Sequence, residues 1–244
     1  MIQCDQPDCF PEGIVAKVSS RDDGTMLDRT KDDRHEPSVV DSRRRFTQQA
    51  GIPYENCVYQ VITYAADRTY DEIKEVGEPD TEGCLADVLY TERPELGLFL
   101  PVADCVATVI YDPGRHALAL AHIGRHASLA GTMRKTIDYF VERGSNPHNL
   151  LVWMAPSVGS ESYRMEYFNE KDSDEWREFA VERPDGVYLN LRGYNRSLAV
   201  QAGVLPEHIA VSPVDTATSG HYFSHSHGDH AARFAVVAYL VTRA

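Results

Sequence analysis

A cysteine and a histidine in the middle of the chain are the residues whose types and spacing could do chemistry together. Cys105 follows Ala103-Asp104 at the end of one apolar run, and His122 lies near the end of the apolar run 117–123. An Asp-Pro-Gly turn at 112–114 joins that run to the run 106–111, which predicts a hairpin. Pairing of the two strands would bring both side chains to one edge of a sheet.

Two kinds of chemistry are open to such a pair. A thiolate and an imidazole are ligands that zinc prefers, so Cys105 and His122 could share a metal ion. They could also act as a nucleophile and its base. The alternative without chemistry is a buried free cysteine, a common core residue, beside an unrelated core histidine.

A second histidine-rich motif lies near the C-terminus. Residues 225–230 read HSHGDH, which is similar to the H-x-H-x-D-H zinc motif of metallo-β-lactamases, where two metal ions activate a water. Only fourteen residues follow it, and none of them is His, Asp, Glu or Cys, so the further ligands of that fold have no place here. The motif is either a loop that caps a following helix, with Asp229 near the helix N-terminus, or an auxiliary metal site. In the second case His225 or His227 would add a ligand to Cys105 and His122.

The pattern of the chain predicts an α+β fold, because strands and helices are mixed without a strict βαβ rhythm. Residues 1–12 are expected to be a flexible leader, and residues 13–244 a single domain. Long polar loops are expected at 21–38 and 74–84, the first of a kind that is often functional. Helices are expected at 38–50, 128–143, 171–182, 190–203 and 230–241, and strands at 13–20, 57–64, 96–102, 106–111, 117–123, 150–154 and 209–212.

Composition narrows the class of protein. The 244 residues are 43% hydrophobic and 25% charged, as in a globular domain. The net charge of −13 disfavours nucleic acid as a partner. The N-terminus has no pattern of a signal peptide, and no apolar run approaches the roughly 20 residues of a membrane span, so a cytoplasmic protein without a membrane partner is expected. Five widely spaced cysteines do not form a disulfide framework.

Seven segments, in the right order from about residue 13 to the end, carry a resemblance to a known family. They read SSRDDG, VYQV, PVADCVATVIYD, HIGRHASLAG, MAPSVGSESYRM, LNLRGYNRSLAVQAGV and HYFSHSHGDHAARFAVVAYL. Together they resemble the YfiH-type laccase-domain family, also called polyphenol oxidases. The resemblance implies a four-layer α/β/β/α sandwich with mixed sheets. It also implies phosphorolysis of purine nucleosides such as adenosine and inosine, with deamination as a side activity, and a metal, usually zinc with copper as the alternative.

The resemblance also assigns residues. Cys105 and His122 match two of the three metal ligands, and Ile62 stands where the family has its first ligand histidine, which weakens the site. Arg125-His126 replaces a Trp-Arg pair, and Asp215-Thr216 replaces a Cys-Thr pair. The residues expected to be catalytic are Cys105, His122, Asp104 and Arg21, and those expected to hold substrate or phosphate are Gln60, Arg125, His126 and Ser224.

Several of these roles have plain alternatives. Asp104 could orient a ligand imidazole or only cap its turn, Arg21 could bind phosphate or be solvated, and His126 could shuttle a proton or be exposed.

Three hypotheses follow. The chain is an enzyme that acts on a purine nucleoside and phosphate, or a non-catalytic binding module, as Ile62 would favour, or a metal hydrolase that uses the loop His225 to His230. The sequence indicates no oligomeric state.

Overall fold

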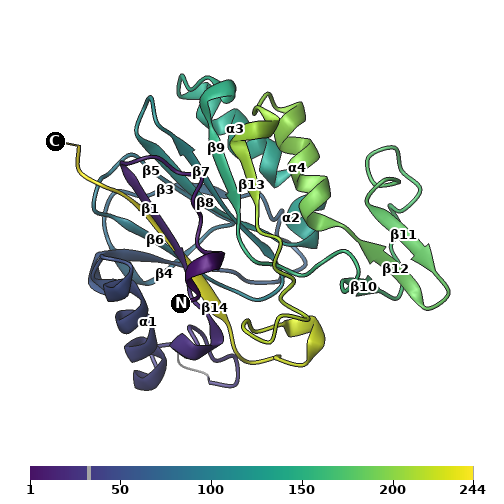
Figure 1. The fold of residues 1–244 in the computed structure, drawn as a ribbon, viewed down its shortest axis with the longest axis horizontal. Helices are drawn as coiled ribbons and strands as arrows, with labels where there is room; N and C mark the ends of the chain where they lie inside the picture. Colours follow the sequence, from purple (N-terminus) through teal and green to yellow (C-terminus); the bar gives the residue numbers. More distant parts are fainter. Residues whose placement is uncertain (32–33, 244) are drawn as a thin grey trace.

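Two β-sheets packed face to face, with helices on both outer sides, form the body of the protein (Figure 1). The computed structural model describes residues 1–31 and 34–243. The first sheet has the strand order β1-β14-β6-β2-β4 and the second the order β13-β9-β7-β8-β5-β3; a small third sheet, β10-β12-β11, protrudes from this body. Both large sheets contain parallel and antiparallel pairs. The expected four-layer α/β/β/α sandwich with mixed sheets is confirmed.

The strands of the first sheet are β1 (Ile14–Val18), β2 (Cys57–Val61), β4 (Asp80–Leu85), β6 (Gly97–Val102) and β14 (Phe234–Leu240). Those of the second sheet are β3 (Ile73–Glu75), β5 (Val88–Thr91), β7 (Val106–Asp112), β8 (Ala117–Ile123), β9 (Leu151–Met154) and β13 (Ile209–Val211). The small sheet contains β10 (Arg164–Met165), β11 (Ala180–Arg183) and β12 (Gly186–Leu189). The helices are α1 (Pro37–Gln49), α2 (Arg125–Leu129), α3 (Thr132–Glu142) and α4 (Leu191–Gln201).

Three apolar cores separate the four layers. Alternate residues of a strand point to opposite faces, so Leu98 and Leu100 of β6 pack between the two sheets while Phe99 packs toward α1. On β7, Val109 faces the inter-sheet core and Ile110 faces the core beneath α3 and α4. A strand buried on both faces is a continuous apolar run in the sequence, which is why the central strands can be predicted from the sequence.

Two helices, α1 and α4, begin within one residue of the expected starts at 38 and 190. The Glu36 carboxylate accepts hydrogen bonds from the backbone N–H groups of Ser38 and Val39 at the start of α1. The Asn190 side chain caps α4 by accepting from the Gly193 N–H at 2.8 Å. The expected helix from Ser128 is instead two helices, α2 and α3, because the chain turns through Gly131 at a φ of 71°.

The prediction of a closing helix at 230–241 was wrong, since this segment is strand β14. All seven of its residues are buried, and it lies between β1 and β6 in the first sheet. A short apolar run that is buried on both faces has the same composition in a helix and in a strand, so periodicity does not separate the two.

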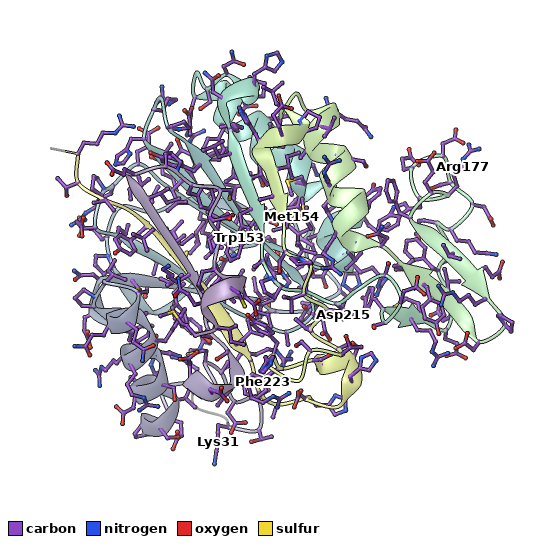
Figure 2. All side chains as sticks on the ribbon, in the orientation of Figure 1. Lys31, Trp153, Met154, Arg177, Asp215 and Phe223 are labelled. Atoms are coloured by element: carbon purple, nitrogen blue, oxygen red, sulfur yellow. The ribbon has the colours of Figure 1, made fainter. Side chains whose placement is uncertain are left out.

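The helix expected at 171–182 was also wrong, because turns lead there into β11. This part of the chain buries mainly Trp176, which stacks on Tyr194 of α4 with ring centroids 3.8 Å apart. One aromatic anchor fixes the segment without a helix. Its neighbour Arg177 lies on the protruding unit, away from the two large sheets (Figure 2).

The polar loop expected at 74–84 includes part of β3 and most of β4. The N-terminal leader makes specific contacts. The Gln6 side chain exchanges hydrogen bonds with the backbone of Val18, and the Tyr222 hydroxyl donates to Asp5 at 2.8 Å. Within the described chain, no helix is both long and apolar enough to cross a membrane.

Candidate active site

The site lies where the chain crosses from one large sheet to the other. β6 of the first sheet ends at Val102, β7 of the second begins at Val106, and Ala103-Asp104-Cys105 makes the crossing. Asp104 adopts a φ of 70°, a left-handed conformation that Asp tolerates better than most residues. A cavity of about 720 Å³ opens beside this turn, within the size range of small-molecule sites.

The two central residues meet in this cavity as the hairpin predicts. In the antiparallel pairing of β7 and β8, Ala107 lies opposite His122, so Cys105 falls beside Gly124. A Cβ atom placed on Gly124 would lie 2.9 Å from the Cys105 sulfur and 3.5 Å from Cε1 of His122. Both reactive side chains therefore border the same point.

Both groups are uncharged at neutral pH. Burial, followed by the charge of Asp104, raises the pKa of the Cys105 thiol to about 11. Burial, followed by the charges of Arg68 and Arg233, lowers the pKa of His122 to about 4. The Nδ1 atom of His122 is buried without a hydrogen-bond partner in the described chain. The pair therefore offers a thiol and a neutral imidazole rather than a thiolate and an imidazolium.

Tyr64 is a polar neighbour of the thiol. Its pKa is raised, chiefly by the charge of Cys105 and then by burial, while its hydroxyl in turn opposes the rise at Cys105. Half of the Tyr64 side chain, 51%, is exposed, so it stands at the mouth of the cavity. Its ring lies 6.5 Å from that of His122 and 6.1 Å from that of His126.

Asp104 ties the crossing turn to two other segments. One carboxylate oxygen accepts from the Thr216 hydroxyl at 2.8 Å, and the other accepts from the Ser226 N–H at 2.7 Å and the Ser226 hydroxyl at 2.8 Å. None of these bonds involves an imidazole, so Asp104 is placed to hold the turn and the loop 224–230 rather than to orient His122.

Positive charge gathers on the cavity wall. The lining includes five cationic side chains, Arg29, Lys31, Arg34, Arg125 and Arg233, and two acidic ones, Asp28 and Asp104. Arg233 is only 7% exposed, and its NH1 donates to three backbone carbonyls, of Asp229, His230 and Ala232. No carboxylate of the described residues forms an ion pair with it. Uncompensated buried charge of this kind is costly unless an anion completes it.

Polar and aromatic side chains complete the lining. The Gln60 Nε2 donates to the carbonyls of Ala86 and Asp87 at 3.1 and 2.8 Å, which fixes the orientation of the amide, and its Oε1 is buried without a partner in the described chain. His126 stacks on Tyr70, with ring centroids 4.7 Å apart and planes 21° apart. The Arg125 NH2 lies 3.0 Å from Nε2 of His126. Burial raises the pKa of Tyr163, on the same wall, to about 12.

Seven of the residues singled out in the sequence line this cavity. They are Gln60, Asp104, Cys105, His122, Arg125, His126 and His225. Three others do not line it: Arg21, Ser224 and His227. Arg21 forms a two-pronged ion pair with Asp229, at 3.1 and 2.6 Å, and stacks over the ring of Phe223. Figure 2 labels Phe223 near the bottom of the view.

The HSHGDH loop is arranged as a structural loop. The carboxylate of Asp229 is engaged by Arg21 and by the Ser224 N–H at 2.9 Å. The Nδ1 of His227 lies 3.1 Å from the Ser226 hydroxyl. Asp229 is thus not available as a ligand, and it does not cap a helix because a strand follows.

The donor set does not fit a three-ligand metal site. No group of three His, Cys, Asp or Glu side chains that could hold a metal ion occurs among residues 1–31 and 34–243. Ile62, which occupies the expected ligand position, lines the cavity with an aliphatic chain. The two donors Cys105 and His122 remain, and two ligands fall short of the three protein ligands typical of catalytic zinc.

Reasoning from sequence missed Tyr64, Tyr163 and most of the cationic wall. Arg29, Lys31 and Arg34 lie in the charged loop 21–38, whose length was the available signal. Arg233 gave no signal, because the segment around it was expected to be helical.

Comparisons with known proteins agree with this fold. The family model described as "Multi-copper polyphenol oxidoreductase laccase" matches residues 20–241. The mouse protein named purine nucleoside phosphorylase LACC1 is 27% identical over 236 residues, which cover 90% of this chain and 53% of that protein. YfiH of Escherichia coli K12, also named a purine nucleoside phosphorylase, is 26% identical over 162 residues, or 64% of this chain and 63% of that protein. The chain thus spans about half to somewhat under two thirds of these curated relatives.

Solved structures share the architecture. YfiH from Bacillus licheniformis has a TM-score of 0.80 at 24% identity, with 93% of this chain and 92% of that chain covered. YlmD from Geobacillus stearothermophilus has a TM-score of 0.79 at 22% identity, with 98% and 94% covered. At these identities the likeness shows the fold alone.

Proposed function

The chain belongs to the multi-copper polyphenol oxidoreductase laccase family, and we propose that it acts on purine nucleosides such as adenosine or inosine, cleaving the glycosidic bond with phosphate. The observation that carries this proposal is the meeting of Cys105 and His122 in one cavity that also holds aromatic and cationic side chains. Rings suit a purine base, and arginines suit phosphate. The names of the relatives point to the same class of substrate.

Phosphorolysis needs groups on the cavity wall that hold the phosphate and donate to the departing base. In phosphorolysis a phosphate oxygen bonds to C1′ of the ribose while the bond from C1′ to the base breaks, and its electron pair leaves with the base. The departing base then needs a proton or a hydrogen-bond donor. Cys105 and Tyr64 keep their protons at neutral pH because their pKa values are raised, so both can donate toward the base. Arg125, beside His126 and Tyr163, is placed to hold the phosphate.

The test is incubation of the purified protein with adenosine or inosine, with and without phosphate, and chromatography of the products. We expect release of adenine or hypoxanthine that depends on phosphate, and inosine from adenosine would report deamination. Cys105→Ala should abolish release. Cys84→Ala, a cysteine of β4 that does not line the cavity, serves as the matched control. Base release that is equal in the Cys105→Ala and wild-type proteins would refute the assignment.

A second candidate is a binding module without turnover. Ile62 favours it, since the position of a ligand histidine in the family pattern carries an aliphatic side chain here. Adenosine that binds stoichiometrically and is never cleaved, with or without added zinc or chelator, would select this alternative.

A further inference from the structure

We propose that the cavity takes a purine nucleoside that carries its own phosphate, a nucleoside 5′-monophosphate, in addition to the inorganic phosphate of the reaction. The inference rests on the proposed function of this site and names its substrate more narrowly. The cationic groups stand on two walls that belong to different sheets. Each wall is placed to bind one phosphate.

The first wall lies at the start of strand β14 in the first sheet. Arg233 immediately precedes β14, and the backbone N–H of Arg29 donates to the carbonyl of Ala231 at 3.0 Å, which holds the Arg29 backbone near Arg233. The charge of Arg29 is one of the influences that lower the pKa of Arg233, as expected of two cations that share a space. His225 completes this wall, with Nδ1 at 3.5 Å from the Arg233 guanidinium. Neither arginine forms an ion pair with a carboxylate of the described chain.

The second wall comes from the second sheet. Arg125 begins α2, separated by one residue from the end of β8, and its neighbours are His126 and the Tyr163 hydroxyl. No carboxylate among the described residues pairs with it either. Both walls line the same cavity as Cys105, which lies on the turn that joins the two sheets.

Charge balance distinguishes the possible ligands. The lining carries three more cations than acids, since five Lys and Arg face two Asp. The acids are already engaged, Asp104 by Thr216 and Ser226, and Asp28 by Thr30. A nucleoside is neutral, and one phosphate carries a charge of roughly −1.5 to −2, which leaves part of this excess unbalanced. A second phosphate on the nucleoside would balance the remainder.

This charge is local, because the whole chain carries −13. A cationic cavity in an acidic protein marks a site for an anion rather than a generally basic surface. The volume of about 720 Å³ lies well within the range that encloses a ligand of this size.

Calorimetric titration of adenosine and of adenosine 5′-monophosphate, in phosphate-free buffer of low salt, tests the inference. We expect the monophosphate to bind at least roughly tenfold more tightly, and the difference to shrink at 0.5 M salt. Arg29→Gln should weaken the monophosphate by a similar factor and leave adenosine unchanged, because Arg29 is an exposed loop residue whose backbone makes the structural contact. Arg177→Gln, on the protruding unit, is the matched control and should change neither.

The outcomes separate the two proposals. Equal affinities for the two ligands, or an Arg29→Gln protein with unchanged affinity for the monophosphate, would overturn the inference. Phosphorolysis of adenosine by a protein that the monophosphate neither binds nor inhibits would overturn it and leave the proposed function standing. Tight binding of the monophosphate without cleavage of any nucleoside would support it and overturn the proposed phosphorolysis. Binding of neither ligand would overturn both.

Discussion

Gly124 offers a direct test of the site, because its missing side chain leaves the space in which Cys105 and His122 meet. In Gly124→Ala the new methyl group would lie 2.9 Å from the Cys105 sulfur and 3.5 Å from Cε1 of His122, whereas ordinary contacts begin at 3.4 Å. The backbone itself accepts alanine, since Gly124 has a φ of −90°. The sulfur therefore has to move by about half an ångström or more, and this displaces a side chain that lines the cavity.

The energetic cost follows from two opposing effects. Overpacking of a buried site costs about 1–3 kcal/mol. Replacing glycine by alanine at a compatible φ restricts the unfolded chain, and this stabilises the folded protein by about 0.4–1 kcal/mol. We therefore expect Gly124→Ala to lower the free energy of unfolding by up to about 2.5 kcal/mol. The protein should remain folded, and its affinity for adenosine should fall roughly tenfold or more, as a loss of about 1.4 kcal/mol implies.

Gly97→Ala is the matched control. Its methyl group would lie 2.6 Å from the sulfur of Cys57 and 3.2 Å from Cδ1 of Ile52, in the core between α1 and the first sheet. Urea unfolding should show a loss of stability at least as large as that of Gly124→Ala, while the affinity of the folded protein for adenosine stays that of the wild type. Equal affinities in Gly124→Ala and Gly97→Ala would refute the idea that ligand binds against Cys105 and His122.

Two further predictions concern the chemistry of the wall. The pKa of His122 is lowered from 6.5 to about 4 in the folded protein. Between these two pH values the unfolded chain binds a proton at this residue and the folded protein does not. His122 should therefore make the wild type lose about 2 kcal/mol of stability between pH 7.5 and 5. His122→Gln lacks this pH-dependent loss. As the pH falls, the stability difference between the two proteins, measured by urea unfolding, should shift in favour of the variant. A difference that does not change with pH would contradict the low pKa of His122. Asp104→Asn keeps the shape and the tolerance of a positive φ but replaces one accepting oxygen, so one of the donors on Thr216 or Ser226 loses its acceptor. We expect a loss of about 1–3 kcal/mol against no change for the exposed Asp67→Asn, and similar stabilities of the two variants would show that the carboxylate does not hold the turn.

Local signals predicted the parts of the fold and site that depend on near neighbours in sequence. The β7–β8 hairpin followed from its turn, where the Asp112 carboxylate accepts from the N–H groups of Gly114 and Arg115. The meeting of Cys105 and His122 followed from that hairpin alone. The Asn190 cap of α4 is a contact between residues three apart.

The rest depends on pairings between distant segments. β14 is a strand because β1 and β6, far away in sequence, flank it in the sheet. Arg233 reaches the cavity only through that pairing, which sets Phe234 opposite Val102. Arg29 reaches it through a hydrogen bond to Ala231, about two hundred residues later in the chain. No periodicity within a segment encodes such partners, so most of the cationic wall could not be predicted from the sequence, whereas the meeting of Cys105 and His122 could.

The substitution at Ile62 changes what the neighbouring cysteine can do. A metal-ligating cysteine must lose its proton, and here burial and the charge of Asp104 both oppose that loss, while the Tyr64 hydroxyl and Arg233 favour it less strongly. His122 adds no positive charge, because it is neutral at pH 7. A protonated thiol, a phenol and a neutral imidazole next to unpaired arginines donate hydrogen bonds and stabilise negative charge. The proposed phosphorolysis asks this wall to hold phosphate and to receive a departing base, and neither role needs a thiolate.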